Sequence, residues 1–140
     1  MSSTMGKIYY KGGYKYQLTR GVVVQVGIKP SKNITTEYID LTRNGSLVIR
    51  KGYCWDGPSG PAIDTKNFMR GSLVHDAAYQ LIRQGYLPAF ARKLADRELH
   101  RIILEDGMSR IRAWLVLRAV SRYAGPAADP SNRKAEMVAP

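Results

Sequence analysis

Hydrophobic and polar residues follow two different periods along the chain, a strand-like one first and a helical one later. Residues 5–53 contain short runs rich in β-branched and aromatic side chains, such as VVVQVGI at residues 22–28. The dipeptide Asn44-Gly45 follows the strand-like run TTEYIDL, residues 35–41, and precedes another apolar run. Asn-Gly between two such runs is typical of a tight hairpin turn. The pattern predicts an N-terminal antiparallel β-sheet of three or four short strands.

A segment punctuated by glycine and proline, residues 53–67, separates this part from the rest of the chain. Its Gly and Pro residues disfavour regular structure, and long loops of this kind tend to carry function. Beyond the loop, apolar residues recur at helical spacing and predict helices at residues 68–84, 89–105 and 109–123. The short connection between the first two helices predicts that they pack as an antiparallel pair.

These elements define the expected domain organisation. A length of 140 residues fits one domain. We therefore predict a single α+β domain over residues 1–126, with a β-rich part at 5–53, the loop at 53–67 and a helical part at 68–125. Residues 127–140 are rich in Ala, Pro and Ser and are expected to form an extended or flexible tail.

The two tryptophans lie on different predicted elements. Trp55, in the loop, either packs on the core or lines a mouth that faces lipid, and packing is the favoured interpretation. Trp114 stands on the third predicted helix among apolar neighbours such as Ile111 and Leu115. We expect Trp114 to belong to the core.

The positive charge of the chain indicates which partners it would favour. Its formal net charge is +11, which favours anionic partners such as nucleic acid, anionic lipid or acidic protein surfaces. The excess is spread along the chain, and Arg110, Arg112, Arg118 and Arg122 form no clean stripe. Nucleic acid is therefore less favoured than lipid or protein. A basic surface that only keeps the protein soluble is an open alternative.

Other features of the sequence argue against a disulfide-stabilised, a membrane-spanning or a secreted protein. The single cysteine, Cys54, permits no internal disulfide. No apolar run approaches the roughly 20 residues needed to span a bilayer. The first residues, MSSTMGKIYYKGG, lack the apolar core of a secretory signal, so we expect no signal peptide and no transmembrane segment.

A constellation of polar residues falls on the first two predicted helices. His75 and Tyr79 are four residues apart and share a helix face. An antiparallel second helix would bring Asp96 back beside them. A neutral imidazole held by a buried carboxylate can act as a general base on water. We predict that His75 is the base, that Asp96 fixes its tautomer, and that Tyr79 donates to Asp96 and holds it.

Asp76 points away from His75, towards the preceding loop. Its carboxylate and the backbone carbonyls of a Gly-rich loop would make an all-oxygen site suited to calcium. A calcium ion there would polarise an ester carbonyl and stabilise the oxyanion formed on attack. The sequence therefore makes Ca²⁺ the expected cofactor.

The order of these motifs resembles that of phospholipase A2. A Gly-rich loop is followed by HDAAY at residues 75–79 and then by Asp96 on the next helix. The segment WDGPS followed by HDAAY is especially similar to the compact phospholipase domain of parvovirus capsid proteins. The resemblance implies hydrolysis of a phospholipid ester, with His75 as base, Asp96 as its orienter, and Asp76 with the Gly57 region as calcium ligands.

The loop departs from the phospholipase pattern in two places. The second glycine of the calcium loop is replaced by Ser59, with Gly60 next to it. Asp56 is an additional carboxylate, which either replaces a carbonyl ligand or caps a turn. The candidate metal ligands are accordingly Asp76, Gly57, Asp56 and Ser59, and the structural or mouth residues are Trp55, Pro58 and Gly60.

A wider resemblance, over roughly residues 45–126, is to a phage and prophage family known as the domain of unknown function 1353 family. It implies an anionic phospholipid membrane or other phage virion proteins as partners, and a location in the virion or in the cytoplasm of an infected bacterium. A non-catalytic virion or assembly protein on the same scaffold is the alternative. The matching positions are Gly52, Tyr53, Asp56, Ser59, Pro61, His75, Asp76, Tyr79, Ala95, Asp96, Ala119, Val120, Tyr123 and Gly125.

Overall fold

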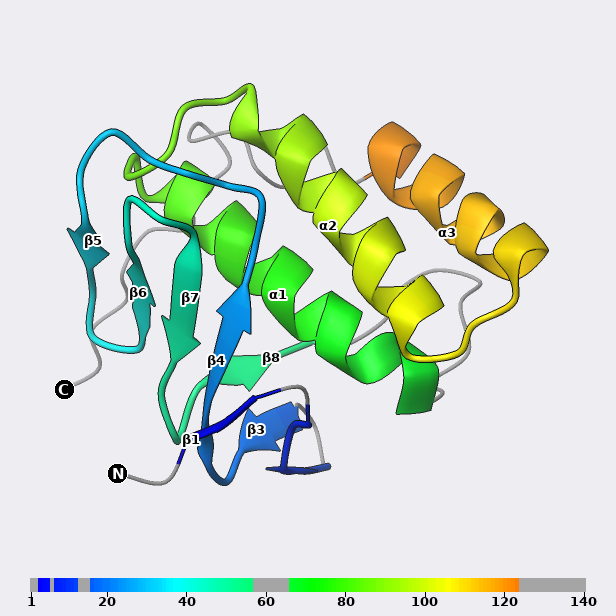
Figure 1. The fold of residues 1–140 in the computed structure, drawn as a ribbon, viewed down its shortest axis with the longest axis horizontal. Helices are drawn as coiled ribbons and strands as arrows, with labels where there is room; N and C mark the ends of the chain where they lie inside the picture. The colour runs from blue at the N-terminus through cyan, green and yellow to red at the C-terminus, as the bar shows by residue number, and fades with distance from the viewer. Residues whose placement is uncertain (1–2, 6, 13–15, 57–65, 124–140) are drawn as a thin grey trace, which may run out of the picture.

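In the described part of the chain, two β-sheets precede three helices, which is the predicted α+β fold (Figure 1). The computed structural model describes residues 3–5, 7–12, 16–56 and 66–123. The strands are β1 (Ser3–Met5), β2 (Tyr10–Lys11), β3 (Tyr16–Leu18), β4 (Gly21–Gln25), β5 (Ile34–Thr35), β6 (Ile39–Leu41), β7 (Ser46–Ile49) and β8 (Cys54–Trp55). The helices are α1 (Lys66–Arg83), α2 (Ala91–Glu105) and α3 (Arg110–Tyr123).

The larger sheet has the strand order β1-β4-β7-β6-β5. Its neighbours pair antiparallel, except that β1 runs parallel to β4. Burial alternates along β4, where Val22 and Val24 are buried and Val23 is half-buried, as the two-residue period of a strand requires. The buried face meets α1, which lies between this sheet and α2 (Figure 1).

The β-part is more divided than the sequence predicts. A second sheet, in the order β2-β3-β8, stands beside the first, so the prediction of one antiparallel sheet was too simple. Residues 35–41 do not form one strand, because the Thr36 hydroxyl donates to the Ile39 carbonyl and accepts from its N–H, which turns the chain. The predicted loop also begins with β8, which pairs with β3.

The three helices agree with their predicted ranges to within about two residues at each end. The first two form the expected antiparallel pair, and α3 packs on α2 (Figure 1). Gly71 allows the close approach of α1 and α2, because a Cβ there would lie only 2.7 Å from Ile103 and 2.9 Å from Leu99. None of the helices in the described part of the chain is long and apolar enough to cross a membrane.

The prediction that Trp114 belongs to the core is wrong. Its exposure is 50%, and its neighbours Ile111 and Leu115 are 76% and 55% exposed. The core face of α3 is formed instead by Ala113 and Val116, which pack in a second hydrophobic cluster with residues of α1 and α2. The helical period locates α3 along the chain, but it does not indicate which side of the helix faces α2.

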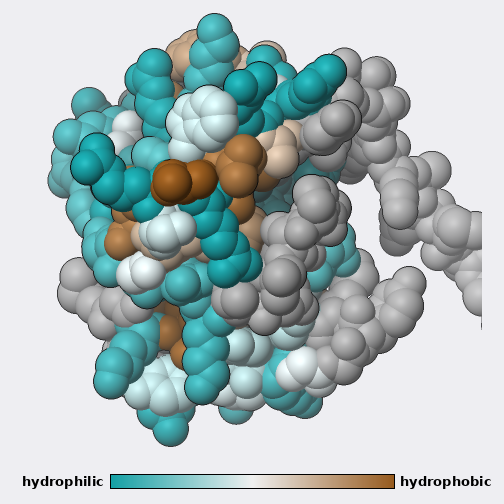
Figure 2. Space-filling model, turned by 90° about the vertical axis from the view of Figure 1, so that its right-hand side faces the viewer, coloured by the Kyte–Doolittle hydropathy of each residue, from teal (hydrophilic) through white to brown (hydrophobic). Residues whose placement is uncertain are grey.

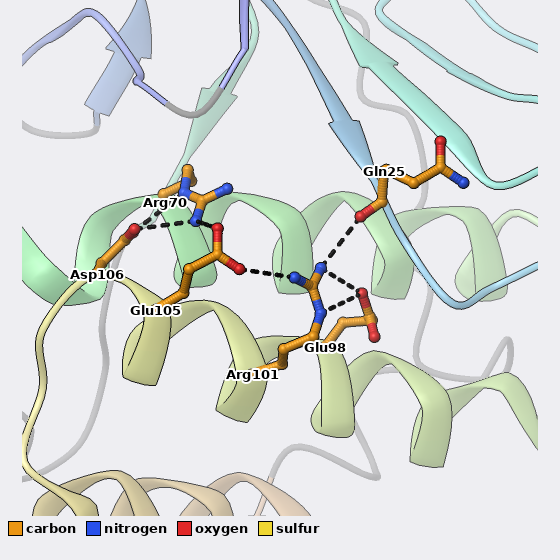
Figure 3. Close-up of polar contacts among 6 residues, drawn as sticks. All are labelled: Gln25, Arg70, Glu98, Arg101, Glu105 and Asp106. Atoms are coloured by element: carbon orange, nitrogen blue, oxygen red, sulfur yellow. Dashed lines mark hydrogen bonds and ion pairs between the residues drawn. The ribbon is translucent and has the colours of Figure 1, made fainter.

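A chain of ion pairs, which the sequence did not suggest, fixes the far end of the helix pair (Figure 3). The buried guanidinium of Arg70 donates to Asp106 at 2.9 and 3.1 Å and to Glu105 at 2.8 Å. Glu105 also accepts from Arg101, which bonds Glu98 and the Gln25 carbonyl at the end of β4. The network joins α1, α2 and the larger sheet through charge-assisted hydrogen bonds.

Alanine substitutions at two glycines should lower the free energy of unfolding by different amounts, because one adds only backbone strain and the other adds steric overlap as well. Gly45 in the hairpin turn and Gly85 after α1 share a positive φ, 85° and 83°. A Cβ at Gly45 would lie 2.3 Å from the Val26 carbonyl oxygen, whereas one at Gly85 meets nothing within 4 Å. Gly85→Ala should cost about 1 kcal/mol of unfolding free energy and Gly45→Ala about 3 kcal/mol or more. Equal losses in urea unfolding would contradict the close approach at Gly45.

Candidate active site

The structure brings His75, Tyr79 and Asp96 together as their spacing predicts. His75 and Tyr79 lie one turn apart on α1, with ring centroids 4.2 Å apart. Nε2 of His75 and the hydroxyl of Tyr79 both lie 2.7 Å from the same oxygen, Oδ1 of Asp96 on α2. The antiparallel packing of α1 and α2 creates this contact, because the three residues occupy facing sides of the pair.

Because both side chains are buried, this contact determines which ring nitrogen of neutral His75 carries the hydrogen. His75 is 6% exposed and Asp96 is 4% exposed, so water solvates neither side chain well. An ionised carboxylate only accepts hydrogen bonds, so the hydrogen of a neutral His75 must reside on Nε2 and donate to Asp96. The opposite nitrogen, Nδ1, then carries a lone pair. This is the nitrogen that can take a proton from a reacting molecule.

Tyr79 keeps the carboxylate in place. Burial, the hydrogen bond to Asp96 and the charge of that carboxylate all raise the pKa of the Tyr79 phenol. The phenol therefore stays protonated at any physiological pH and remains a hydrogen-bond donor. Asp96 consequently receives two short bonds on one oxygen, and this restricts the rotation of its carboxyl group.

A third donor to Asp96 was missed by sequence reasoning. The Ser121 hydroxyl on α3 lies 3.4 Å from Oδ2 of Asp96, a long hydrogen bond to the second carboxylate oxygen. The sequence held no clear signal for it, because the contact depends on how α3 is rotated against α2. With Ser121 included, the carboxylate joins all three helices.

Asp76 lies on the Nδ1 side of the imidazole. Its Oδ1 is 4.0 Å from Nδ1 of His75, too far for a hydrogen bond, and its side chain is 32% exposed. Burial raises the pKa of Asp76 to about 6, and the negative charge of Asp56 raises it further. Three contributions lower this pKa: the charge of His75, the hydrogen bond that Asp76 accepts from the Asp56 backbone, and the charge of Arg83. Ionisation of Asp76 is thus costly mainly because its carboxyl group is partly removed from water.

A carboxylate that is costly to ionise fits a position beside a bound cation. Asp76 and Asp56 supply the hard oxygen donors that calcium prefers. The described residues hold no group of three or more metal-ligating side chains, so a calcium site here would need further oxygen ligands from the backbone. The other predicted loop positions, Gly57, Pro58, Ser59 and Gly60, lie outside the described residues, as does the predicted tail at 127–140.

Trp55 packs in the core, as the favoured interpretation predicts. It is buried, and its Nε1 donates to the Ser72 hydroxyl at 3.1 Å. Ser72 lies on α1, three residues before His75. A similar bond, from the Tyr53 hydroxyl to Gln80 at 3.1 Å, ties the start of the same segment to α1. The two bonds fix the chain just before the loop against the helix that carries the histidine.

Comparisons with protein-family models, with curated proteins and with solved structures found no match to the chain.

Asp76→Asn should make stability less dependent on pH. A folded-state pKa of about 6, above the usual 3.8, means that the folded protein binds more protons than the unfolded chain between these values. The contribution of Asp76 to the free energy of unfolding should therefore be largest below about pH 4 and should be lost as pH rises through 6. The loss should be on the order of 1–2 kcal/mol, after allowance for the partial exposure of the side chain.

Urea unfolding at pH 4.5, 6 and 7.5, with chelator present, measures this dependence. Asp76→Asn should be more stable than wild type at pH 7.5 and should lack the decline. Glu37→Gln, which removes an exposed carboxylate from the turn between β5 and β6, is the matched control. A decline of the same size in Asp76→Asn would show that Asp76 is not its source.

Proposed function

We propose that the chain is a phage-encoded, phospholipase A2-like hydrolase that cleaves an acyl ester of a glycerophospholipid with water. The observation that carries this proposal is the buried chain from Tyr79 to Asp96 to His75, which leaves Nδ1 of the imidazole as the proton acceptor. The order of the motifs in the sequence supports the lipid substrate and the phage origin. The proposed location is the virion or the infected bacterial cell.

In the proposed reaction, the oxygen of a water molecule attacks the ester carbonyl carbon while Nδ1 of His75 takes one of the water protons. Asp96 stabilises the resulting imidazolium through Nε2. Collapse of the tetrahedral intermediate breaks the acyl carbon–oxygen bond, and Nδ1 returns the proton to the departing alcohol oxygen. The products are a fatty acid and a lysophospholipid, and the histidine regains its starting tautomer.

Asp76 is the proposed protein ligand of a calcium ion, together with Asp56 and the loop positions Gly57 and Ser59. When bound, calcium supplies positive charge that stabilises the oxyanion of the intermediate. The raised pKa of Asp76 supports this assignment, because a carboxylate that is costly to ionise alone gains most from a cation beside it. A bound calcium ion would also keep Asp76 ionised near neutral pH.

A non-catalytic virion or assembly protein is the second candidate function. The observation that favours it is the contact of Asp96 with residues of both α1 and α3, a buried polar network that would hold the helices together without any reaction. In that case the histidine is a structural donor, and the protein contacts other virion proteins rather than lipid.

Release of fatty acid from phosphatidylglycerol vesicles in calcium tests the hydrolase directly. We expect wild type to release fatty acid, chelator to abolish the release, and His75→Ala to lower its rate by at least about 100-fold, the usual contribution of a general base. His100→Ala is the matched control, because His100 is the other histidine of the chain and lies on α2 outside the constellation. Its rate should equal that of wild type.

The same assay distinguishes the second candidate. No release by wild type, combined with a large loss of melting temperature in Asp96→Asn, would favour the structural role. Release at an equal rate by His75→Ala and wild type would reject the proposed base. Asp96→Asn that is as stable as wild type would remove the support for the structural alternative.

A further inference from the structure

The outward face of α3 carries an apolar surface with basic neighbours. Ile111, Trp114 and Leu115 stand at positions i, i+3 and i+4, which share one face of a helix, and all three are largely exposed. Figure 2 views the molecule from the side on which α3 lies in Figure 1, and it shows hydrophobic atoms at the surface bordered by hydrophilic side chains. Exposed apolar groups that gather in this way mark an interaction surface.

The charge on α3 is entirely basic. Its sequence, RIRAWLVLRAVSRY, has four arginines and no acidic residue. Arg110 and Arg118 are exposed, and the guanidinium of Arg118 lies 4.9 Å from the centre of the Trp114 ring. This stacking holds a cation beside the apolar surface. The face therefore combines exposed apolar side chains with two exposed arginines, one of which is stacked on Trp114.

We propose that this face of α3 docks the protein on an anionic lipid bilayer. The apolar side chains would enter the boundary between head groups and acyl chains, and Arg110 and Arg118 would bind lipid phosphates. A second copy fits this face poorly, because a symmetric contact of α3 with α3 would oppose arginines with no acidic partner on the helix. The overall charge of +11 favours the same anionic surface.

The docking face and the candidate active site share a helix. Ser121, on α3, makes the 3.4 Å contact with Asp96, so the helix that meets the bilayer also contacts the carboxylate behind His75. Docking itself does not require catalysis. Its role in presenting an ester to His75 rests on the proposed hydrolase function.

Tryptophan fluorescence with vesicles reports on this docking. The chain has two tryptophans, of which Trp55 is buried and Trp114 is half-exposed, so a spectral change on binding reports mainly Trp114. We expect a blue shift with phosphatidylglycerol vesicles, quenching by brominated acyl chains, and no response with phosphatidylcholine alone. The experiment uses His75→Ala in chelator, so lipid cannot be hydrolysed and a failure of the hydrolase function does not affect the result.

Two double variants identify the surface. Arg110→Glu with Arg118→Glu should weaken binding by at least about 25-fold, since each arginine near an anionic membrane contributes about fivefold. Lys29→Glu with Lys32→Glu changes the net charge equally in the exposed loop between β4 and β5 and should weaken binding much less. Ile111→Ser with Leu115→Ser removes exposed apolar groups and should weaken binding by about tenfold or more without loss of melting temperature.

Several results would overturn the proposal. Absence of vesicle binding, or equal weakening by the arginine and lysine variants, would remove α3 as the docking face. A blue shift that depends on protein concentration without vesicles would instead assign the face to contact between copies. Binding without quenching by brominated lipid would show that Trp114 does not enter the bilayer.

Discussion

The buried carboxylate of Asp96 is the constraint on which the arrangement of the helices depends. A charge that is 4% exposed is tolerated only when hydrogen-bond donors surround it, and these come from His75 and Tyr79 on α1 and from Ser121 on α3. Loss of one of the two short bonds would leave part of the buried carboxylate without a donor, which typically costs about 1–3 kcal/mol or more for a charged group. His75 is one of these donors, so the same requirement places the hydrogen of its neutral imidazole on Nε2 and links helix packing to the chemistry proposed for the site.

The rest of the fold brings the two helices close enough for this contact. The larger sheet covers one side of α1, and the absence of a side chain at Gly71 lets α2 approach the other. The network around Arg70 closes the far end of the pair, away from the imidazole. Bonds from Tyr53 and Trp55 to α1 then hold the entry to the loop against the histidine helix. Rigid elements on three sides thus position a small polar site, as a general base requires.

Local sequence patterns predicted much of this arrangement. The helical period located all three helices, and the spacing of His75 and Tyr79 with an antiparallel partner predicted the contact with Asp96. Features that depend on tertiary orientation were not predictable. The side of α3 that faces α2 decided both the exposure of Trp114 and the contact of Ser121, and no local pattern encodes that rotation. The division of the strands into two sheets also depends on pairing between distant residues.

The tautomer of neutral His75 is the property on which the chemistry proposed for the site depends. Nitrogen NMR of the imidazole in ¹⁵N-labelled protein distinguishes a nitrogen that carries hydrogen from one that carries a lone pair, and His100→Ala removes the signals of the other histidine. We expect neutral His75 to carry its hydrogen on Nε2, with an unprotonated Nδ1, and we expect Asp96→Asn to lose this preference. A hydrogen on Nδ1 of neutral His75 in the wild-type protein would rule out His75 as the general base, because the imidazole would then have no basic nitrogen outside its contact with Asp96.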